Sequence, residues 1–263
     1  MGIDASLSDY DWHAALAALS WQVDLGVVEF SVDAPVDRYA LPEKLEPVAK
    51  LKAAAPALPA APSLDSVQAA ETAARACNDL PTLRAALAAY DHCTLKKGAR
   101  NLVFADGNPS AHLMLVGDAP SREEDLDGRP FTGPSGQLLD KMLAAIGHAR
   151  DAADAAKSAY LTTAVPWRPH GDSDPSPTDI SMLRPFLLRH IAMIKPRVLI
   201  AFGNTACMAL LGQDGISRLR GKWGESAGIA VMPMTNPQTL LRNPAAKRDA
   251  WADLLDVQAR LAQ

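Results

Sequence analysis

The stretch VGDAPSREEDLDGRPFTGPSG, at residues 116–136, carries chemically capable side chains on a glycine-rich loop. Asp118 follows the apolar run LMLVG directly, and Phe131 lies further along with glycines on both sides. A carboxylate can stabilise a developing positive charge or orient a water molecule, and an aromatic ring can stack on a planar ligand. This loop is therefore the first candidate for a catalytic or binding site.

Alternating strands and helices position this loop. Four short apolar runs, HLMLVG, AYLTTAV, RVLIAFG and IAVMPMT, alternate with predicted helices at residues 137–146, 180–194, 205–211 and 244–261. This alternation predicts an α/β fold, a three-layer αβα sandwich with a short central parallel sheet of about four strands. Two more helices are expected at residues 64–78 and 81–90.

Polar residues and glycine occur where the predicted strands end. In open parallel sheets, ligands bind beyond the carboxyl ends of the strands. We therefore expect the strand-end residues to converge at one edge of the sheet: Asp118, Thr163, Gly203 and Asn236.

The first 63 residues differ from the rest in composition. Residues 1–50 are predicted to be a helical segment, because apolar residues recur at three- and four-residue steps in residues 11–27. Residues 51–63 are rich in alanine and proline and are predicted to be a linker. Residues 64–263 are then one domain, with its core from about Cys93 onward.

Charge and hydropathy exclude several classes of protein. The chain has a formal net charge of -4, but residues 1–99 carry 8 basic and 13 acidic side chains, and residues 100–263 carry 18 and 17. The total neither indicates nor excludes a nucleic-acid partner, since a local basic patch matters more. No apolar run reaches membrane-spanning length and no signal pattern begins the chain. We expect a cytoplasmic protein with no membrane partner.

Common cofactor and metal motifs are absent from the sequence. The three cysteines are far apart, and no histidine pair has metal-ligand spacing, so we predict no metal site. GxGxxG, P-loop and nucleophile-elbow patterns are not matched either. The six histidines lie outside the candidate loops, and surface or core positions are expected for them.

An ordered set of segments resembles the uracil-DNA glycosylase superfamily, nearest to its bacterial family 4. The segments are GDAPSREEDLDGRPFTGPSGQLLDKML, YLTTAVPWRP, KPRVLIAFGNTA, ISRLRGKW and NPQTLLRNPAAKRDAW, from about Cys93 to the end of the chain. The resemblance implies a DNA glycosylase, which flips a nucleotide out of DNA and hydrolyses its N-glycosidic bond to leave an abasic site. It also implies DNA as the partner, and we expect a monomer.

One departure from the family concerns a cofactor. Family 4 enzymes carry four cysteines around an iron–sulfur cluster, and of these only Cys93 is present here. Tyr90, Trp167 and Leu183 stand at the other three ligand positions. One thiolate cannot hold a cluster that needs four ligands, so we predict that the protein has no cofactor.

Other departures concern the base pocket. The family's Gly-Glu-Ala-Pro-Gly reads Gly-Asp-Ala-Pro-Ser here, the asparagine that reads uracil is Thr163, and the histidine that supports the leaving base is Asn236. The resemblance assigns catalysis to Asp118, which serves the sugar, and to Asn236, which donates to a base oxygen. It assigns base binding to four residues: Ala119, Ser121, Phe131 and Thr163. Simpler roles remain open, a helix or turn cap for Asp118 and core packing for Phe131.

Outside the pocket, the segment RLRGKW and the end of NPQTLL are candidates for DNA contact. Arg218, Arg220 and Lys222 are suited to phosphates, although a solvated basic loop is the alternative. Leu240 or Leu241 would be the apolar wedge that related enzymes insert into DNA, and ordinary packing at a helix start is equally open for both.

Three functions compete at this point. The chain is an ordinary uracil-DNA glycosylase of base-excision repair, a glycosylase altered for another base, or a non-catalytic DNA-binding relative. We favour the second, because the pocket residues are replaced by polar residues rather than lost. Ser121 and Thr163 are small, so a cytosine enlarged at carbon 5, such as the hydroxymethylated or glucosylated cytosine of phage DNA, is the candidate substrate. The function would then be antiviral defence.

Overall fold

A six-stranded sheet is the centre of the fold. The structure, a computed structural model, describes residues 64–263, and its strands lie in the order β1-β3-β2-β4-β6-β5. The four inner strands are mutually parallel and correspond to the four predicted apolar runs: β2 (Leu113–Gly117), β3 (Ala159–Thr163), β4 (Val198–Phe202) and β6 (Ile229–Met234). The α/β fold class is therefore confirmed.

Two short edge strands raise the strand number from the expected four to six. β1 (Ala105–Gly107) pairs antiparallel with β3, and β5 (Gly224–Ser226) pairs antiparallel with β6. Each edge strand has three residues and is only partly buried. Neither contains the apolar run by which the inner strands were predicted. Such strands depend on a neighbouring strand for their backbone hydrogen bonds, which the sequence pattern alone does not reveal.

The helices follow the predictions closely, with shifts at their ends. Most begin earlier than expected, because a proline or glycine occupies the first turn without interrupting the helix. The six-residue helices α4 and α9 were not expected. The helical elements are α2 (Leu64–Ala76), α3 (Leu80–Ala89), η2 (Thr94–Lys97), α4 (Arg122–Asp127), α5 (Gly133–Ala145), η3 (His170–Asp172), α6 (Pro177–Ile194), α7 (Gly203–Leu211), α8 (Ile216–Leu219), α9 (Pro237–Arg242), η4 (Pro244–Ala246) and α10 (Lys247–Leu261).

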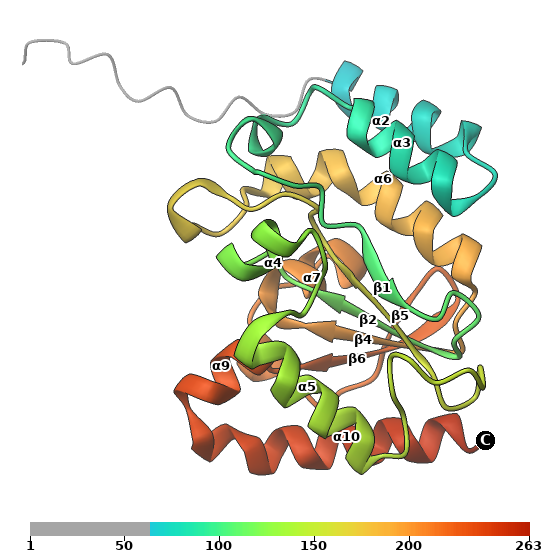
Figure 1. The fold of residues 1–263 in the computed structure, drawn as a ribbon, viewed down its shortest axis with the longest axis vertical. Helices are drawn as coiled ribbons and strands as arrows, with labels where there is room; N and C mark the ends of the chain where they lie inside the picture. Colours follow the sequence, from blue (N-terminus) through green and yellow to red (C-terminus); the bar gives the residue numbers. More distant parts are fainter. Residues whose placement is uncertain (1–63) are drawn as a thin grey trace, which may run out of the picture. The chain divides into compact units, whose positions relative to one another are not determined.

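The helices form a layer on each face of the sheet (Figure 1). On one face, α6 and α7 pack on alternate strand residues such as Met114 and Leu199, and α2 and α3 pack against α6. On the other face, α5, α9 and α10 cover the intervening residues, such as Leu115 and Ile200. Both faces of each inner strand are buried, which explains the continuous rather than alternating apolar runs. This arrangement is the predicted three-layer sandwich.

The predicted helical segment at residues 1–50 and the linker at residues 51–63 lie outside the described residues. All residues that are described belong to one compact unit. Within residues 64–263, no helix combines the length and apolar character needed to cross a membrane.

The register of the parallel strands brings their carboxyl ends to one edge. Gly117 pairs with Thr163, and Phe202 pairs with Met234. The loops that follow these strands therefore start side by side, as expected from the strand pattern. The candidate site is built at this edge.

Candidate active site

The Asp118 carboxylate lies at the junction of three elements. Its Oδ1 accepts hydrogen bonds from the backbone N–H groups of Thr205 (2.8 Å) and Ala206 (3.3 Å), in the first turn of α7. Its Oδ2 accepts from Nδ2 of Asn236 (3.0 Å), the residue before α9. Asp118 thus caps α7, because the N-cap residue of that helix, Phe202, has no side chain that can do so. The capping role and the position at the strand ends coexist.

Gly203 makes this arrangement sterically feasible. Its φ of +89° lies in the left-handed region, and a Cβ at this position would come within 1.9 Å of Asp118 Oδ2. The backbone after β4 therefore approaches the carboxylate more closely than any side chain would permit.

Burial sets the charge state of Asp118. Removal from solvent raises its pKa to about 6, although hydrogen bonds from Asn236 and the α7 backbone favour the ionised form. The carboxylate therefore changes its charge just below neutral pH.

Asn236 connects Asp118 to α9. Its Oδ1 accepts from the Gln238 backbone N–H (2.9 Å) and caps α9, while its Nδ2 donates to Asp118. The amide nitrogen has a second hydrogen, and Asn236 lines the cavity described next. Asn236 is thus oriented from both sides, with a donor left for a ligand.

A small cavity opens beside Asp118. It encloses about 340 Å³ with its mouth included, and a cleft of about 1440 Å³ adjoins it, sharing Asp118 and Asn236 among its walls. Every residue that the sequence analysis placed around the base contributes to the cavity. Its walls are Gly117, Asp118, Ala119, Ser121, Glu124, Phe131, Ser135, Thr163, Asn236 and Gln238.

Phe131 forms one wall of the cavity and also packs in the core. Its side chain is 5% exposed, its ring meets Phe202 edge-on with centroids 5.8 Å apart, and a Cβ on Gly117 would lie 2.8 Å from the ring. Its φ of +52° is left-handed, which costs a bulky residue about 1–3 kcal/mol. Phe131 is therefore a core residue, the simpler role left open, and it also lines the cavity, while its stacking on a base stays a prediction.

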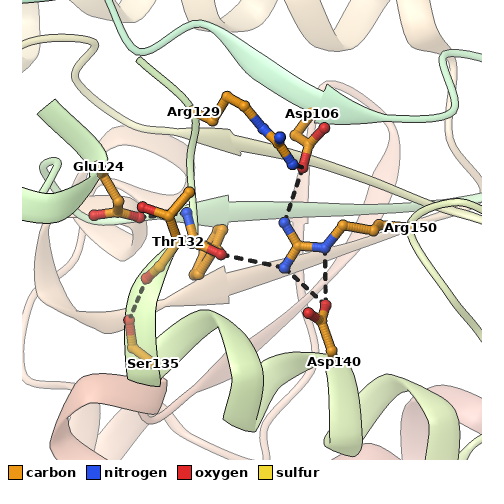
Figure 2. A network of polar contacts seen from close by, with 8 residues as sticks. Asp106, Glu124, Arg129, Thr132, Ser135, Asp140 and Arg150 are labelled. Carbon is orange, nitrogen blue, oxygen red and sulfur yellow. Dashed lines mark hydrogen bonds and ion pairs between the residues drawn. The ribbon is translucent and has the colours of Figure 1, made fainter. Parts of the chain in front are cut away.

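Glu124 is a cavity residue that the sequence analysis missed. It is buried, and its Oε2 accepts from the Ser121 backbone N–H (2.6 Å). Its Oε1 accepts from the Phe131 backbone N–H, and Figure 2 shows Glu124 beside the turn that contains Thr132. Burial raises its pKa, with the two backbone donors opposing the shift. The spacing Ser-x-x-Glu predicts a capping box, which the structure contains, but the folding of the loop back over Glu124 has no local signal.

Thr163 and Ser121 differ in how their hydroxyls are used. The Ser121 Oγ accepts from the Glu124 backbone N–H (3.3 Å) as the cap of α4. Thr163 Oγ1 is buried and is one of three buried side-chain polar atoms in residues 64–263 that have no hydrogen-bond partner. A buried hydroxyl without a partner costs about 1–3 kcal/mol, so a ligand that bonds it would recover this energy.

The basic segment RLRGKW divides into inward and outward side chains. Arg220 forms a bidentate pair with the buried Asp253 (2.6 and 3.1 Å) and also donates to the Asp249 carbonyl. Arg218 and Lys222 are exposed. The sequence spacing did not reveal that Arg220 has a partner on α10. Two further arginines, Arg122 and Arg242, line the cleft next to the cavity.

The two candidate wedge residues have opposite environments. Leu240 is 1% exposed and packs in the core under α9, whereas Leu241 is 42% exposed. Core packing therefore accounts for Leu240, and only Leu241 presents an apolar side chain to solvent.

The four positions at which the family resemblance would place iron–sulfur ligands all lie in the apolar core. Tyr90, Cys93, Trp167 and Leu183 belong to one buried cluster around α6. Cys93 donates to Asp179 (3.5 Å), burial raises its pKa to about 12, and the Tyr90 hydroxyl donates to the Ser66 carbonyl. A protonated thiol, a phenol, an indole and a leucine do not fit the four thiolates of an iron–sulfur cluster.

Comparison with known proteins assigns the family. The sequence model of the Uracil DNA glycosylase superfamily matches residues 104–255, more than half of the chain. The chain therefore belongs to the uracil DNA glycosylase superfamily, a class of DNA glycosylases. The predicted resemblance is confirmed.

The relatives point to one branch of the superfamily. A type-4 uracil-DNA glycosylase of Archaeoglobus fulgidus is 33% identical over 172 residues, 61% of this chain and 82% of the relative. One of Pyrobaculum aerophilum is 33% identical over 185 residues, 67% and 91%. A type-5 uracil-DNA glycosylase of the same organism is 30% identical over 146 residues, 51% and 64%. The chain thus fits the type-4-like branch.

Gly203→Ala tests whether the carboxylate depends on the glycine. The added Cβ clashes with Asp118, so we expect a loss of about 3 kcal/mol in unfolding free energy, measured by urea titration, and loss of base release. Gly212→Ala is the matched control, because Gly212 ends the same helix with φ +68° but has open space around its Cβ. It should cost only about 1 kcal/mol and leave activity unchanged. Equal effects of the two substitutions would contradict the clash.

The absence of thiolate ligands predicts the metal content. Purified protein should be colourless and contain neither iron nor labile sulfide, as measured by elemental analysis and absorbance. A broad band near about 400 nm together with stoichiometric iron would overturn this prediction.

Proposed function

We propose that the chain flips a nucleotide out of DNA, holds its base in the cavity beside Asp118 and hydrolyses the N-glycosidic bond. The observation that carries the proposal is the contact between Asp118 and Asn236 at the mouth of that cavity. Two groups needed at opposite ends of the breaking bond, an acceptor for the sugar side and a donor for the base side, are held 3.0 Å apart.

The charges of the reaction match these two groups. Cleavage develops positive charge on the deoxyribose and negative charge on the departing base. The ionised Asp118 stabilises the sugar cation by its charge and orients the attacking water with the lone pair that its three hydrogen bonds leave. The free N–H of Asn236 stabilises an oxygen of the leaving base. Because Asp118 and the α9 backbone hold Asn236 from both sides, little reorganisation is needed during the reaction.

The remaining pocket residues bind the base. The Phe131 ring stacks on the flipped base, and Ala119, Ser121 and Thr163 surround it. Arg218, Lys222 and the cleft arginines contact DNA phosphates, while Arg220 anchors its loop to α10. Leu241 fills the gap left by the flipped nucleotide. DNA is the partner, and the protein acts as a monomer in the cytoplasm.

For the substrate, we propose a cytosine enlarged at carbon 5 rather than plain uracil. A hydroxyl such as that of Thr163 can donate or accept, so it bonds the amino group of cytosine as readily as the carbonyl of uracil. An ionised Glu124 in the same cavity only accepts, which favours a base with an amino group. Half of the wall residues are small, and Phe131 is the one aromatic ring among them. Such an enzyme would act on modified phage DNA as an antiviral defence.

Plain uracil is the second candidate, and the similarity to the type-4 and type-5 uracil-DNA glycosylases favours it. A non-catalytic relative is the third. Its support is the cap that Asp118 forms on α7, because a cap alone would also explain the carboxylate.

Asp118→Asn separates the charge from the cap. The amide oxygen can still accept from the α7 backbone, so the cap remains and only the hydrogen bond from Asn236 Nδ2 is lost. The melting temperature should therefore fall less than in Asp118→Ala, whereas base release should fall about a hundredfold to a thousandfold. Single-turnover release of the base, read as alkali-labile abasic sites, is the measurement. Asp118→Ala should lose both the activity and about 1 kcal/mol of stability.

The pH profile provides the sign of the Asp118 effect. Base release should rise with pH through about 6 and then level off, since the ionised carboxylate is active. The free energy of unfolding should change in the opposite direction, because the raised pKa favours the protonated carboxyl in the folded state. The stabilisation from this protonation is fully present below about pH 4 and is lost as the pH rises past about 6. Asp118→Asn should show neither dependence. An active Asp118→Asn protein with the natural pH profile would leave Asp118 as a cap only.

The substrate is tested with four duplexes that carry one uracil, cytosine, 5-hydroxymethylcytosine or glucosylated 5-hydroxymethylcytosine. We expect abasic sites mainly with the enlarged cytosines. Thr163→Asn with Asn236→His should shift release toward uracil, by about tenfold or more, because the amide discriminates donors from acceptors. Thr163→Val is the control of equal shape, and it should reduce release while raising stability by removing the buried hydroxyl.

Each result of the panel selects one function. Efficient release of uracil together with no release of enlarged cytosines would establish the second candidate. DNA binding without release of any base would establish the third.

A further inference from the structure

The backbone of Phe131 is held from both sides by charged side chains. Its N–H donates to Glu124, and its carbonyl oxygen accepts from Arg150 Nη2 (3.2 Å). Phe131 has a left-handed φ of +52°, which a phenylalanine adopts only where its surroundings impose it. The two hydrogen bonds are therefore candidates for what imposes it.

Arg150 is itself tightly positioned. It lies in the loop after α5, its side chain is 15% exposed, and its guanidinium bonds Asp106 of β1 (2.9 Å) and Asp140 of α5 (2.8 Å) (Figure 2). One planar group thus connects the edge strand β1, the helix α5 and the Phe131 turn. Its fork geometry allows all three bonds at once, which a lysine cannot reproduce.

The same turn leaves little room for displacement. A Cβ at Gly136, in the first turns of α5, would lie 1.9 Å from the Phe131 carbonyl oxygen. A Cβ on Gly117 would touch the far edge of the Phe131 ring. The backbone of α5 thus lies against the Phe131 carbonyl, and the backbone of β2 lies against the Phe131 ring. A small rotation of the carbonyl would therefore also move the ring relative to the cavity.

We propose that Arg150 is a positioning residue, which acts through Phe131 to hold the stacking wall of the cavity in place. The kinetic part rests on the proposed function, since it needs a flipped base against the ring. Arg150 touches neither the base nor Asp118. The missed strand β1 has a role here, because its Asp106 orients Arg150.

Arg129 is the matched control. It also bonds Asp106 (3.1 Å), its side chain is 59% exposed, and within residues 64–263 no hydrogen bond links it to Phe131. Arg129→Met and Arg150→Met each remove one guanidinium from Asp106, but only Arg150→Met frees the Phe131 carbonyl.

The position of the ring is read without any substrate. The chain has five phenylalanines, so protein labelled with 4-fluorophenylalanine gives five ¹⁹F resonances, and the Phe131→Leu protein assigns one of them. Arg150→Met should shift or broaden the Phe131 resonance, Arg150→Lys should do so less, and Arg129→Met should leave it unchanged. An unchanged Phe131 resonance in Arg150→Met, or an equal shift in Arg129→Met, would overturn the proposal.

The kinetic arm uses single-turnover release from duplexes containing uracil or 5-hydroxymethylcytosine at saturating protein. Arg150→Met should slow release about tenfold to a hundredfold, as expected for a misplaced group. In a Phe131→Leu background the same substitution should change the rate less than about twofold, because the path through the ring is gone. Full additivity would refute positioning through Phe131. If the natural protein releases neither base, the proposed function fails and the ¹⁹F result alone decides the role of Arg150.

Discussion

The carboxylate of Asp118 is the group around which the carboxyl-terminal edge of the sheet is arranged. It accepts hydrogen bonds from two backbone N–H groups in the first turn of α7 and from the amide of Asn236, which in turn caps α9. Two helices that follow different strands are thereby tied to the loop after a third. The arrangement requires a glycine at position 203, because no side chain fits between β4 and the carboxylate. A partly buried charge thus determines where the loops of the site lie.

Stability and chemistry compete in this arrangement. Burial raises the Asp118 pKa toward neutrality, which disfavours the ionised group that the proposed reaction needs. Phe131 is held in a strained conformation, and Thr163 buries a hydroxyl without a partner. Each of these features lowers the stability of the folded protein, and all three residues line the same cavity. Strained backbone and locally inconsistent features of this kind cluster at active sites and ligand sites in proteins.

Away from the cavity, apolar packing fills the positions at which the family resemblance would place cluster ligands. Tyr90, Trp167 and Leu183 join the core that α2, α3 and α6 share. Tyr90 adds a hydrogen bond to α2 and an edge-on contact with Phe186. The α2–α3 pair is thus attached to the sheet domain by burial of apolar surface.

The sequence by itself determined the inner sheet and the convergence of its loops. Continuous apolar runs mark strands buried on both faces, and parallel strands must end at one edge, so Asp118, Thr163 and Asn236 were predictable as neighbours. The tertiary structure alone decided which neighbouring side chains face inward. Arg220 pairs with Asp253 and Leu240 packs in the core, while Leu241, next to it, is exposed. Glu124 and Arg150 converge on Phe131 from different segments, and β1 forms only against β3. Periodicity reports the burial of an element, whereas these contacts depend on residues distant in sequence, which no local pattern encodes.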